Sequence, residues 1–167
     1  GIKQAVPAAQ SGVFWIQTPR LIAPRQVYCD MVTDGGGWTL IGRGRENWNF
    51  TPVGQGDATA IATVPDGVGA FSPATYSEEV VDGILNGARP DQLADGVRLR
   101  RATNTAGSVF QEMRWQIQGP GNLQGRDRWT WAFNGGVALS NVIIDGVTYG
   151  ATNSIATSWT LPGQNTP

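Results

Sequence analysis

The chain has 167 residues, a formal net charge of −1 and 15% charged residues, which suits one domain or one domain with an appended tail. It has no histidine and a single cysteine, which excludes Ser-His-Asp and Cys-His catalysis on this chain alone and excludes thiolate zinc sites. Its 23 glycines and 10 prolines predict a β-rich fold with many turns.

Alternating apolar residues predict strands in the first half of the chain over residues 13–18, 26–32 and 38–43. The residues Thr-Asp-Gly-Gly-Gly between the second and third strands have the chemistry of a hairpin, because glycine accepts positive φ. The small, polar segment 49–72 predicts a long surface loop. Ser77 is expected to cap a short helix that ends near Gly87, with two glutamates in its first turn.

The period of two returns in the second half, where strands are predicted over residues 97–102, 109–117 and 127–133. If the first two pair in an antiparallel manner, Arg98 or Arg100 meets Glu112 across the solvent face. Asp145-Gly146 between β-branched runs predicts a hairpin over residues 142–149. The expected organisation is one domain over residues 1–150, followed by a tail or linker over residues 151–167.

Three stretches near the N-terminus resemble a known family. SGVFWI at residues 11–16 is followed by VYCDM at residues 27–31 and DGGGWTL at residues 34–40. Together they resemble the N-terminal signature of fibrinogen-related domains, which also occurs in intelectin lectins and in bacterial or phage modules with a YCD…GGGWT pattern. The resemblance implies an α+β, β-dominated, fibrinogen-like fold with twisted antiparallel sheets, short helices and long glycine-rich loops.

The resemblance implies structural roles for seven residues, namely Tyr28, Cys29, Asp30, Gly35, Gly36, Gly37 and Trp38. The glycines let the chain reverse beside a neighbouring backbone where a Cβ would clash, and Trp38 is expected to fold inward over the bend. In the family, the matching cysteine pairs with one upstream, which here would fall before Gly1. Cys29 is therefore either a half-cystine or a buried thiol. The family's later cysteines and paired calcium-site aspartates have no counterpart after residue 100, so its ligand pocket does not transfer.

A first candidate ligand site follows the third predicted strand and comprises Arg45, Asn47, Trp48 and Asn49. An indole face stacks on sugar C–H groups, while amides and charged groups bind hydroxyls. The alternative interpretation is a loop in which Trp48 and Phe50 anchor the following segment. A second candidate comprises Asp127, Trp129 and Trp131 on one strand face, which forms a sugar platform if exposed and core if buried.

The acidic residues favour neither a metal site nor catalysis. Asp57, Asp66, Asp91 and Asp95 match no calcium-binding spacing, so the metal ligands are unknown; calcium is kept as a candidate cofactor because lectins often use it. No pair of carboxylates has the context that a glycosidase needs, and the chain is predicted not to be an enzyme.

These features predict a secreted or surface-displayed recognition module that binds carbohydrate without catalysis. The expected partner is a glycan on a cell surface, bound with avidity by a homo-oligomer or a larger surface or virion assembly. No nucleic acid and no membrane insertion are expected, since the sequence has no basic cluster and no long apolar run. The location is extracellular, on a cell surface or on a virion surface. The alternatives are a structural domain of a virion tail, fibre or appendage that contacts other subunits, and a toxin or adhesin fragment that binds a protein receptor.

Overall fold

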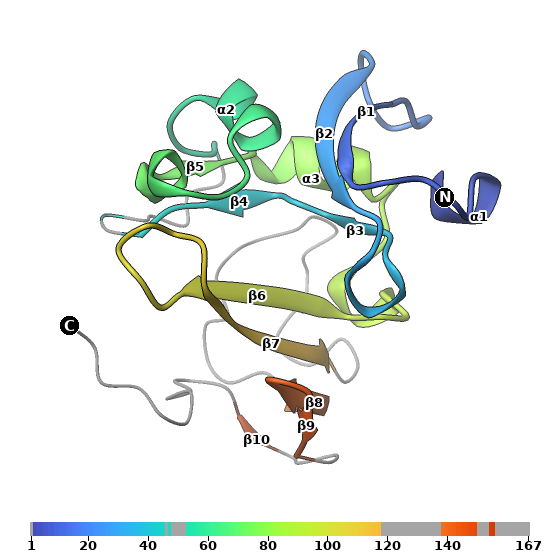
Figure 1. The fold of residues 1–167 in the computed structure, drawn as a ribbon. Helices are drawn as coiled ribbons and strands as arrows, with labels where there is room; N and C mark the ends of the chain where they lie inside the picture. Colours follow the sequence, from blue (N-terminus) through green and yellow to red (C-terminus); the bar gives the residue numbers. More distant parts are fainter. Residues whose placement is uncertain (1, 46, 48–52, 118–137, 150–153, 156–167) are drawn as a thin grey trace. The chain divides into compact units, whose positions relative to one another are not determined.

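The computed structural model describes residues 2–45, 47, 53–117, 138–149 and 154–155. The chain forms two compact units, residues 1–87 and 88–167, each with antiparallel strands (Figure 1). The strands and the few short helices give the β-dominated α+β class that the sequence predicted. No helix within the described ranges is both long enough and apolar enough to cross a bilayer.

The first unit contains, in chain order, α1 (Ile2–Ala5), β1 (Gly12–Ile16), β2 (Arg25–Asp30), η1 (Thr33–Gly35), β3 (Trp38–Thr39), β4 (Gly42–Arg43), α2 (Ala58–Thr63), η2 (Val68–Phe71), β5 (Ala74–Thr75) and α3 (Glu78–Ile84). Strands β1, β2 and β3 form one antiparallel sheet in that order, and β4 pairs separately with β5. The prediction of one strand over residues 38–43 was therefore wrong. Leu40 N still donates to Tyr28 O (3.0 Å), but Ile41 O already accepts from Tyr76 N (3.1 Å), so the chain changes partner between these residues.

The alternation of β2 places Val27, Cys29 and Met31 in the core of the first unit, as the pattern predicted. The segment expected to be a long loop instead contains α2 and η2. Asp57 begins α2, because its side chain accepts from Thr59 N at 2.8 Å, and the helix buries Ile61 completely. Burial of one apolar turn, at Ile61 and Ala62, thus stabilises a helix in a segment whose small and polar residues predicted a loop.

Helix α3 follows its predicted signals. Ser77 Oγ accepts from Val80 N (3.3 Å), and Glu78 and Glu79 occupy the first turn, where carboxylates complement the helix dipole. Beyond the C-terminal end, Gly87 has φ of +79° and its N–H donates to Asp82 O at 2.8 Å. Local sequence therefore accounts for both ends of this helix.

The bend between β2 and β3 depends on left-handed backbone at four successive residues. Asp34, Gly35, Gly36 and Gly37 have φ values of +50°, +83°, +76° and +89°. A Cβ on Gly36 would overlap the carbonyl group of Met31, whereas a Cβ on Gly35 would meet nothing within 4 Å. The three glycines are thus unequal, since only Gly36 combines positive φ with close backbone approach.

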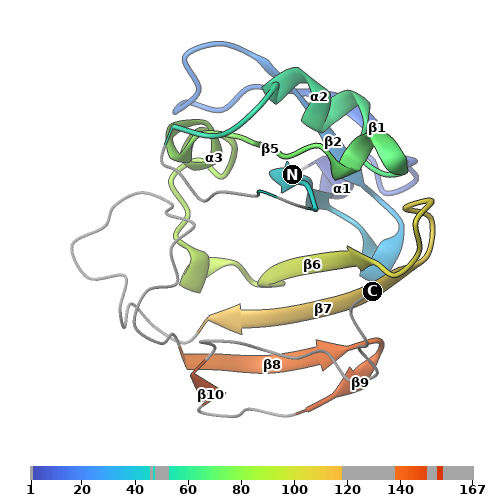
Figure 2. The same cartoon turned by 90° about the vertical axis from the view of Figure 1, so that its left-hand side faces the viewer.

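The second unit contains η3 (Pro90–Gln92), β6 (Val97–Ala102), β7 (Phe110–Ile117), β8 (Ala138–Ile144), β9 (Val147–Thr148) and β10 (Ser154–Ile155). Its sheet runs β10-β8-β7-β6, with β9 also paired to β8 (Figure 2). Asp145 and Gly146 have φ of +47° and +79°, as the predicted hairpin requires. The predicted strand over residues 127–133 lies outside the described residues, and the division into a domain and a tail stays a prediction.

One face of the second unit's sheet carries a hydrophobic cluster, which consists of Met113, Trp115, Ile117, Leu139, Val142 and Ile144. The opposite face of β6 and β7 carries the predicted charge pairs. Arg100 lies directly opposite Glu112, and Glu112 Oε2 is 3.9 Å from the Nε atoms of both Arg98 and Arg100. Arg98 and Arg100 thus lie on one face of β6.

Alanine substitutions at Gly36 and Gly35 test the bend. Gly35→Ala introduces only left-handed strain, about 1–2 kcal/mol. Gly36→Ala adds an overlap with the Met31 carbonyl, so we expect a further loss of about 1–3 kcal/mol in the free energy of unfolding. Urea unfolding of both variants measures the difference, and equal losses would contradict the close-approach explanation.

Candidate functional site

The entry to the bend is held by a buried carboxylate. Asp30 Oδ1 accepts hydrogen bonds from Ser11 Oγ (3.3 Å), Val32 N (3.1 Å) and Thr33 N (3.0 Å). Ser11 Oγ in turn accepts from Met31 N at 2.9 Å. Hydrogen bonds to a charged acceptor are stronger than neutral ones, so Asp30 links β1 to the start of the bend.

The indole of Trp38 lies across the same bend. Its Nε1 donates to Thr33 O at 3.2 Å, and the side chain is half-buried. Tyr28, also half-buried, pairs with Val13 on β1. The residues that the family resemblance singled out therefore lie in or beside one bend, and their structural roles stay predictions.

Cys29 is a free, buried thiol in this structure. Its Sγ lies 3.9 Å from Thr39 Oγ1 across the β2–β3 pair. Burial raises the pKa of the Cys29 thiol above its usual value, and the hydrogen bond with Thr39 offsets part of that rise. A thiol with a raised pKa is a poor nucleophile at neutral pH, which suits a structural role.

Two residues of the first candidate ligand site are described, and both are exposed. Arg45 lies beyond β4, where its N–H donates to Phe71 O (3.0 Å) and its guanidinium carbon lies 4.8 Å from the Phe71 ring centroid. Asn47 has φ of +57°, and its carbonyl accepts from Gln55 Nε2 at 2.8 Å. These contacts hold the chain at Arg45 and Asn47 and leave both side chains exposed.

The remaining predicted ligand residues lie outside the described residues, namely Trp48, Asn49, Asp127, Trp129 and Trp131. The structure therefore brings Arg45 and Asn47 onto one loop, and the two aromatic surfaces stay predictions.

Two of the scattered acids have structural partners. Asp57 caps α2, and Asp91 Oδ1 accepts from Arg89 Nε at 2.9 Å, a contact that lowers the pKa of Asp91. In the described part of the chain, no three His, Cys, Asp or Glu side chains group closely enough to hold a metal ion. Calcium stays an untested candidate.

Nothing in the sequence indicated that Arg43 would be buried. This arginine on β4 donates through Nε (3.4 Å) and Nη2 (3.3 Å) to Ala60 O of α2, and through Nη1 to Ser72 O. Its guanidinium thereby binds two segments that follow it in the chain. Burial lowers the pKa of Arg43, although a nearby carboxylate, Asp57, opposes the shift.

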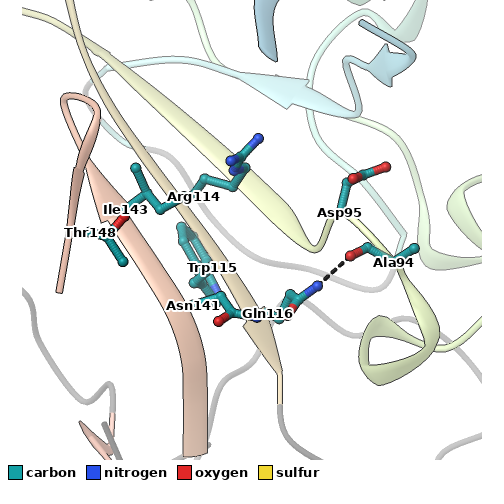
Figure 3. A pocket seen from close by; sticks show the side chains of 8 residues that line it. All are labelled: Ala94, Asp95, Arg114, Trp115, Gln116, Asn141, Ile143 and Thr148. Carbon is teal, nitrogen blue, oxygen red and sulfur yellow. Dashed lines mark hydrogen bonds between the residues drawn. The ribbon is translucent and has the colours of Figure 1, made fainter. Parts of the chain in front are cut away.

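The sequence also did not predict a polar cavity in the second unit. Its volume is about 340 Å³, and its lining includes Asp95, Arg114, Gln116, Asn141, Ile143 and Thr148. Figure 3 shows these side chains arranged around it, from the turn before β6 and from strands β7, β8 and β9. Cavities of this size lie at the lower end of the range for small-molecule sites. The sequence signal is a break in the alternation of β8, where the apolar positions Leu139 and Val142 are three residues apart.

An apolar surface is exposed along β1. Trp15 is 68% exposed and Val13 is 45% exposed, and the two side chains share one face because they are two residues apart on a strand. Strand β1 is the first in the order of its three-stranded sheet. Within the described ranges its outer edge pairs with no other strand.

Comparison with known proteins agrees with the bend and its surroundings. Residues 3–52 match the family model for the C-terminal globular domain of fibrinogen beta and gamma chains. This segment is similar to the first part of a fibrinogen-related domain. The match covers β1, β2, the bend, β3 and β4.

Angiopoietin-4 proteins are relatives of this fibrinogen-related segment. The protein of Bos taurus is 50% identical over 44 residues, which are 26% of this chain and 9% of the relative. The Homo sapiens protein is 40% identical over 57 residues (30% and 11%), and the Mus musculus protein is 58% identical over 31 residues (19% and 6%). The match thus spans about a tenth of these relatives, and the cavity of the second unit lies beyond the family match.

The buried thiol of the fibrinogen-related segment makes stability depend on pH. Because the folded state raises the pKa of Cys29, its contribution is complete below the unfolded pKa, about 8.5, and is lost as pH rises through the folded value. We expect the free energy of unfolding of the reduced chain to fall between pH 7 and pH ~9.5. In Cys29→Ala this part of the decrease should disappear. Urea unfolding at both pH values gives the comparison, and an unchanged slope in the variant would show that other groups cause it.

Proposed function

We propose that this chain is an extracellular recognition module that binds carbohydrate and performs no catalysis. The fibrinogen-related segment supplies the scaffold, and the polar loop that begins at Arg45 supplies contacts for a glycan. Support for the location comes from the family match, since fibrinogen chains and angiopoietins are extracellular proteins. Single sugars bind such surfaces weakly, so the module would act in several copies on one particle or oligomer.

The observation that carries this proposal is the exposure of Arg45 and Asn47 at two places where the chain has defined contacts. The guanidinium of Arg45 lies over the Phe71 ring, and the Gln55 amide donates to the Asn47 carbonyl, so the chain is held at these two residues before a ligand arrives. A preordered loop loses less entropy on binding. Guanidinium and amide groups together offer the donors and acceptors that sugar hydroxyls require.

A glycan array with the chain displayed in multivalent form tests the proposal. We expect Trp48→Ala and Arg45→Ala each to weaken binding at least tenfold, about 1.4 kcal/mol, because they remove a stacking surface and a charged donor. Trp129→Ala tests the second predicted surface in the same way. A glycan signal that none of the three substitutions reduces would contradict both predicted surfaces.

The matched control is Trp15→Ala, which removes another indole from the first unit at a place far from the Arg45 loop in sequence. We expect this variant to retain glycan binding. An array on which the wild-type chain binds no glycan at all would reject the carbohydrate proposal itself.

A second candidate function is protein contact within a virion tail, a fibre or a cell-surface appendage. The exposed Trp15 and Val13 on edge strand β1 favour it, since tryptophan is enriched at interface hot spots and an unpaired strand edge can pair with another chain. Aromatic residues on such an edge serve subunit contacts as readily as ligands.

Self-association distinguishes this second function. If β1 mediates subunit contact, the wild-type chain should sediment as an oligomer and Trp15→Ala should weaken the assembly at least tenfold, about 1.4 kcal/mol. Trp48→Ala should leave the assembly unchanged. Analytical ultracentrifugation of the three chains gives the measurement, and a monomeric wild-type chain at high concentration would exclude a homomeric contact through β1.

A further inference from the structure

We propose that the cavity between the turn before β6 and strands β7, β8 and β9 is a second ligand site, which binds a saccharide carrying a carboxylate. The proposal rests on the proposed function only for its ligand class, since it uses no residue of the Arg45 loop. It begins with the way in which the strands place polar side chains at the cavity.

An irregularity in the β7–β8 pairing aims Asn141 at the site. Gln116 pairs with Ser140 and Arg114 with Ile143, so one residue of β7, Trp115, faces two of β8. This is a β-bulge with Asn141 at φ of +49°. Bulges occur next to functional sites, where they redirect a side chain.

The bulge separates apolar from polar residues on β8. Leu139 and Val142 are both buried although they are three residues apart, and Asn141 between them is exposed. Its Nδ2 donates to Gln116 Oε1, and Gln116 Nε2 donates to Ala94 O (Figure 3). Each NH2 group has a second N–H, and no further hydrogen bond of these two amides is found among the described residues. The amides are therefore oriented and retain capacity for a ligand.

A close backbone approach brings Asp95 to the same place. Gly96, with φ of +74°, lies so near β7 that a Cβ would overlap the carbonyl oxygen of Trp115, the residue that faces the bulge. Only glycine permits this approach. The turn thus places the Asp95 carboxylate on the rim of the cavity, opposite the strand side chains (Figure 3).

The cavity has a charged group of each sign in its lining. Arg114 supplies the guanidinium and Asp95 the carboxylate. Arg98 lies directly opposite Arg114, and Arg100 directly opposite Glu112, so the strand face beside the cavity carries three guanidinium groups and one carboxylate. A ligand carboxylate therefore finds its charged donor on the strand side of the cavity, at Arg114.

The lining residues favour binding of a sugar acid rather than of a simple anion. The guanidinium of Arg114 can bind a carboxylate in a bidentate manner, and the amides of Gln116 and Asn141 can bind hydroxyls. The Asp95 carboxylate accepts from hydroxyls but repels an anion, which sets the direction in which the ligand lies. Ile143 and the Thr148 methyl offer a small apolar surface to sugar C–H groups.

The test compares methyl β-glucuronide with methyl β-glucoside, which differ in the carboxylate, by ligand-detected NMR titration of the full chain. We expect the glucuronide to bind at least tenfold more tightly, and its binding to weaken as salt is raised. Arg114→Gln should abolish this preference, and Arg114→Lys should restore part of it because the charge returns without the planar fork. Equal binding of the two sugars, or no binding of the glucuronide, would overturn the proposal.

Asn141→Gly gives the sharper variant, because glycine keeps the positive φ that the bulge needs while removing the amide. We expect at least a tenfold loss of glucuronide affinity. The matched control, Asn86→Gly, changes another exposed asparagine with positive φ (+52°) in the first unit and should bind as the wild-type chain does. Full affinity in Asn141→Gly would reject the site.

Two further arms separate this site from its alternatives. Acetate that competes as well as the glucuronide would show a site for carboxylates alone and would overturn the saccharide assignment. Glucuronide binding should persist in Trp48→Ala, which supports a site independent of the Arg45 loop. If other glycans bind in a Trp48-dependent way while the glucuronide does not bind, this inference fails and the proposed function stands.

Discussion

The structure of the first unit depends on how closely the backbone at Gly36 approaches the carbonyl of Met31. Approach at this distance excludes any side chain, and it needs left-handed backbone on both sides to turn the chain. The buried carboxylate of Asp30 holds the start of the bend through Ser11 and two backbone N–H groups, and the indole of Trp38 lies across it. Polar groups are therefore satisfied where the chain reverses, which lets β1, β2 and β3 form a sheet over a buried Val27, Cys29 and Met31.

The second unit also contains a glycine at which two backbone segments approach closely. Gly96 brings a turn against β7 just as Gly36 brings the bend against Met31, but here the approach builds the rim of a polar cavity. The bulge on β8 places polar side chains on the opposite side of the cavity. The hydrophobic cluster stays continuous, because Val142 and Leu139 both pack in it. The family match covers the bend and its strands, and the polar side chains of the cavity come from a region beyond that match.

Features with a local physical cause could be predicted from the sequence. Ser77 and the following glutamates specify the start of α3, Asp145-Gly146 specifies a hairpin, and the alternation of Arg98, Arg100 and Glu112 places their side chains on one face. Of the first candidate ligand site, Arg45 and Asn47 are exposed in the structure, and their role in binding stays a prediction. The predictions of secondary structure were wrong where the pairing depends on a segment that is distant in the sequence. Residues 38–43 read as one strand, yet they pair with β2 first and with β5 next, because each backbone group bonds to whichever strand is near.

By itself, the sequence determined where the chain turns and which residues alternate between faces, because glycine, capping side chains and apolar periodicity act within a few residues. It also determined the likeness of residues 3–52 to fibrinogen-related domains, since the spacing of Cys29, the glycines and Trp38 is a linear pattern. Tertiary structure decided the rest: the burial of Arg43 between segments, the helix that Asp57 begins, and the bulge that turns Asn141 toward Gln116. Those outcomes depend on which strand or helix lies opposite, because the register between distant segments is set only when the chain folds.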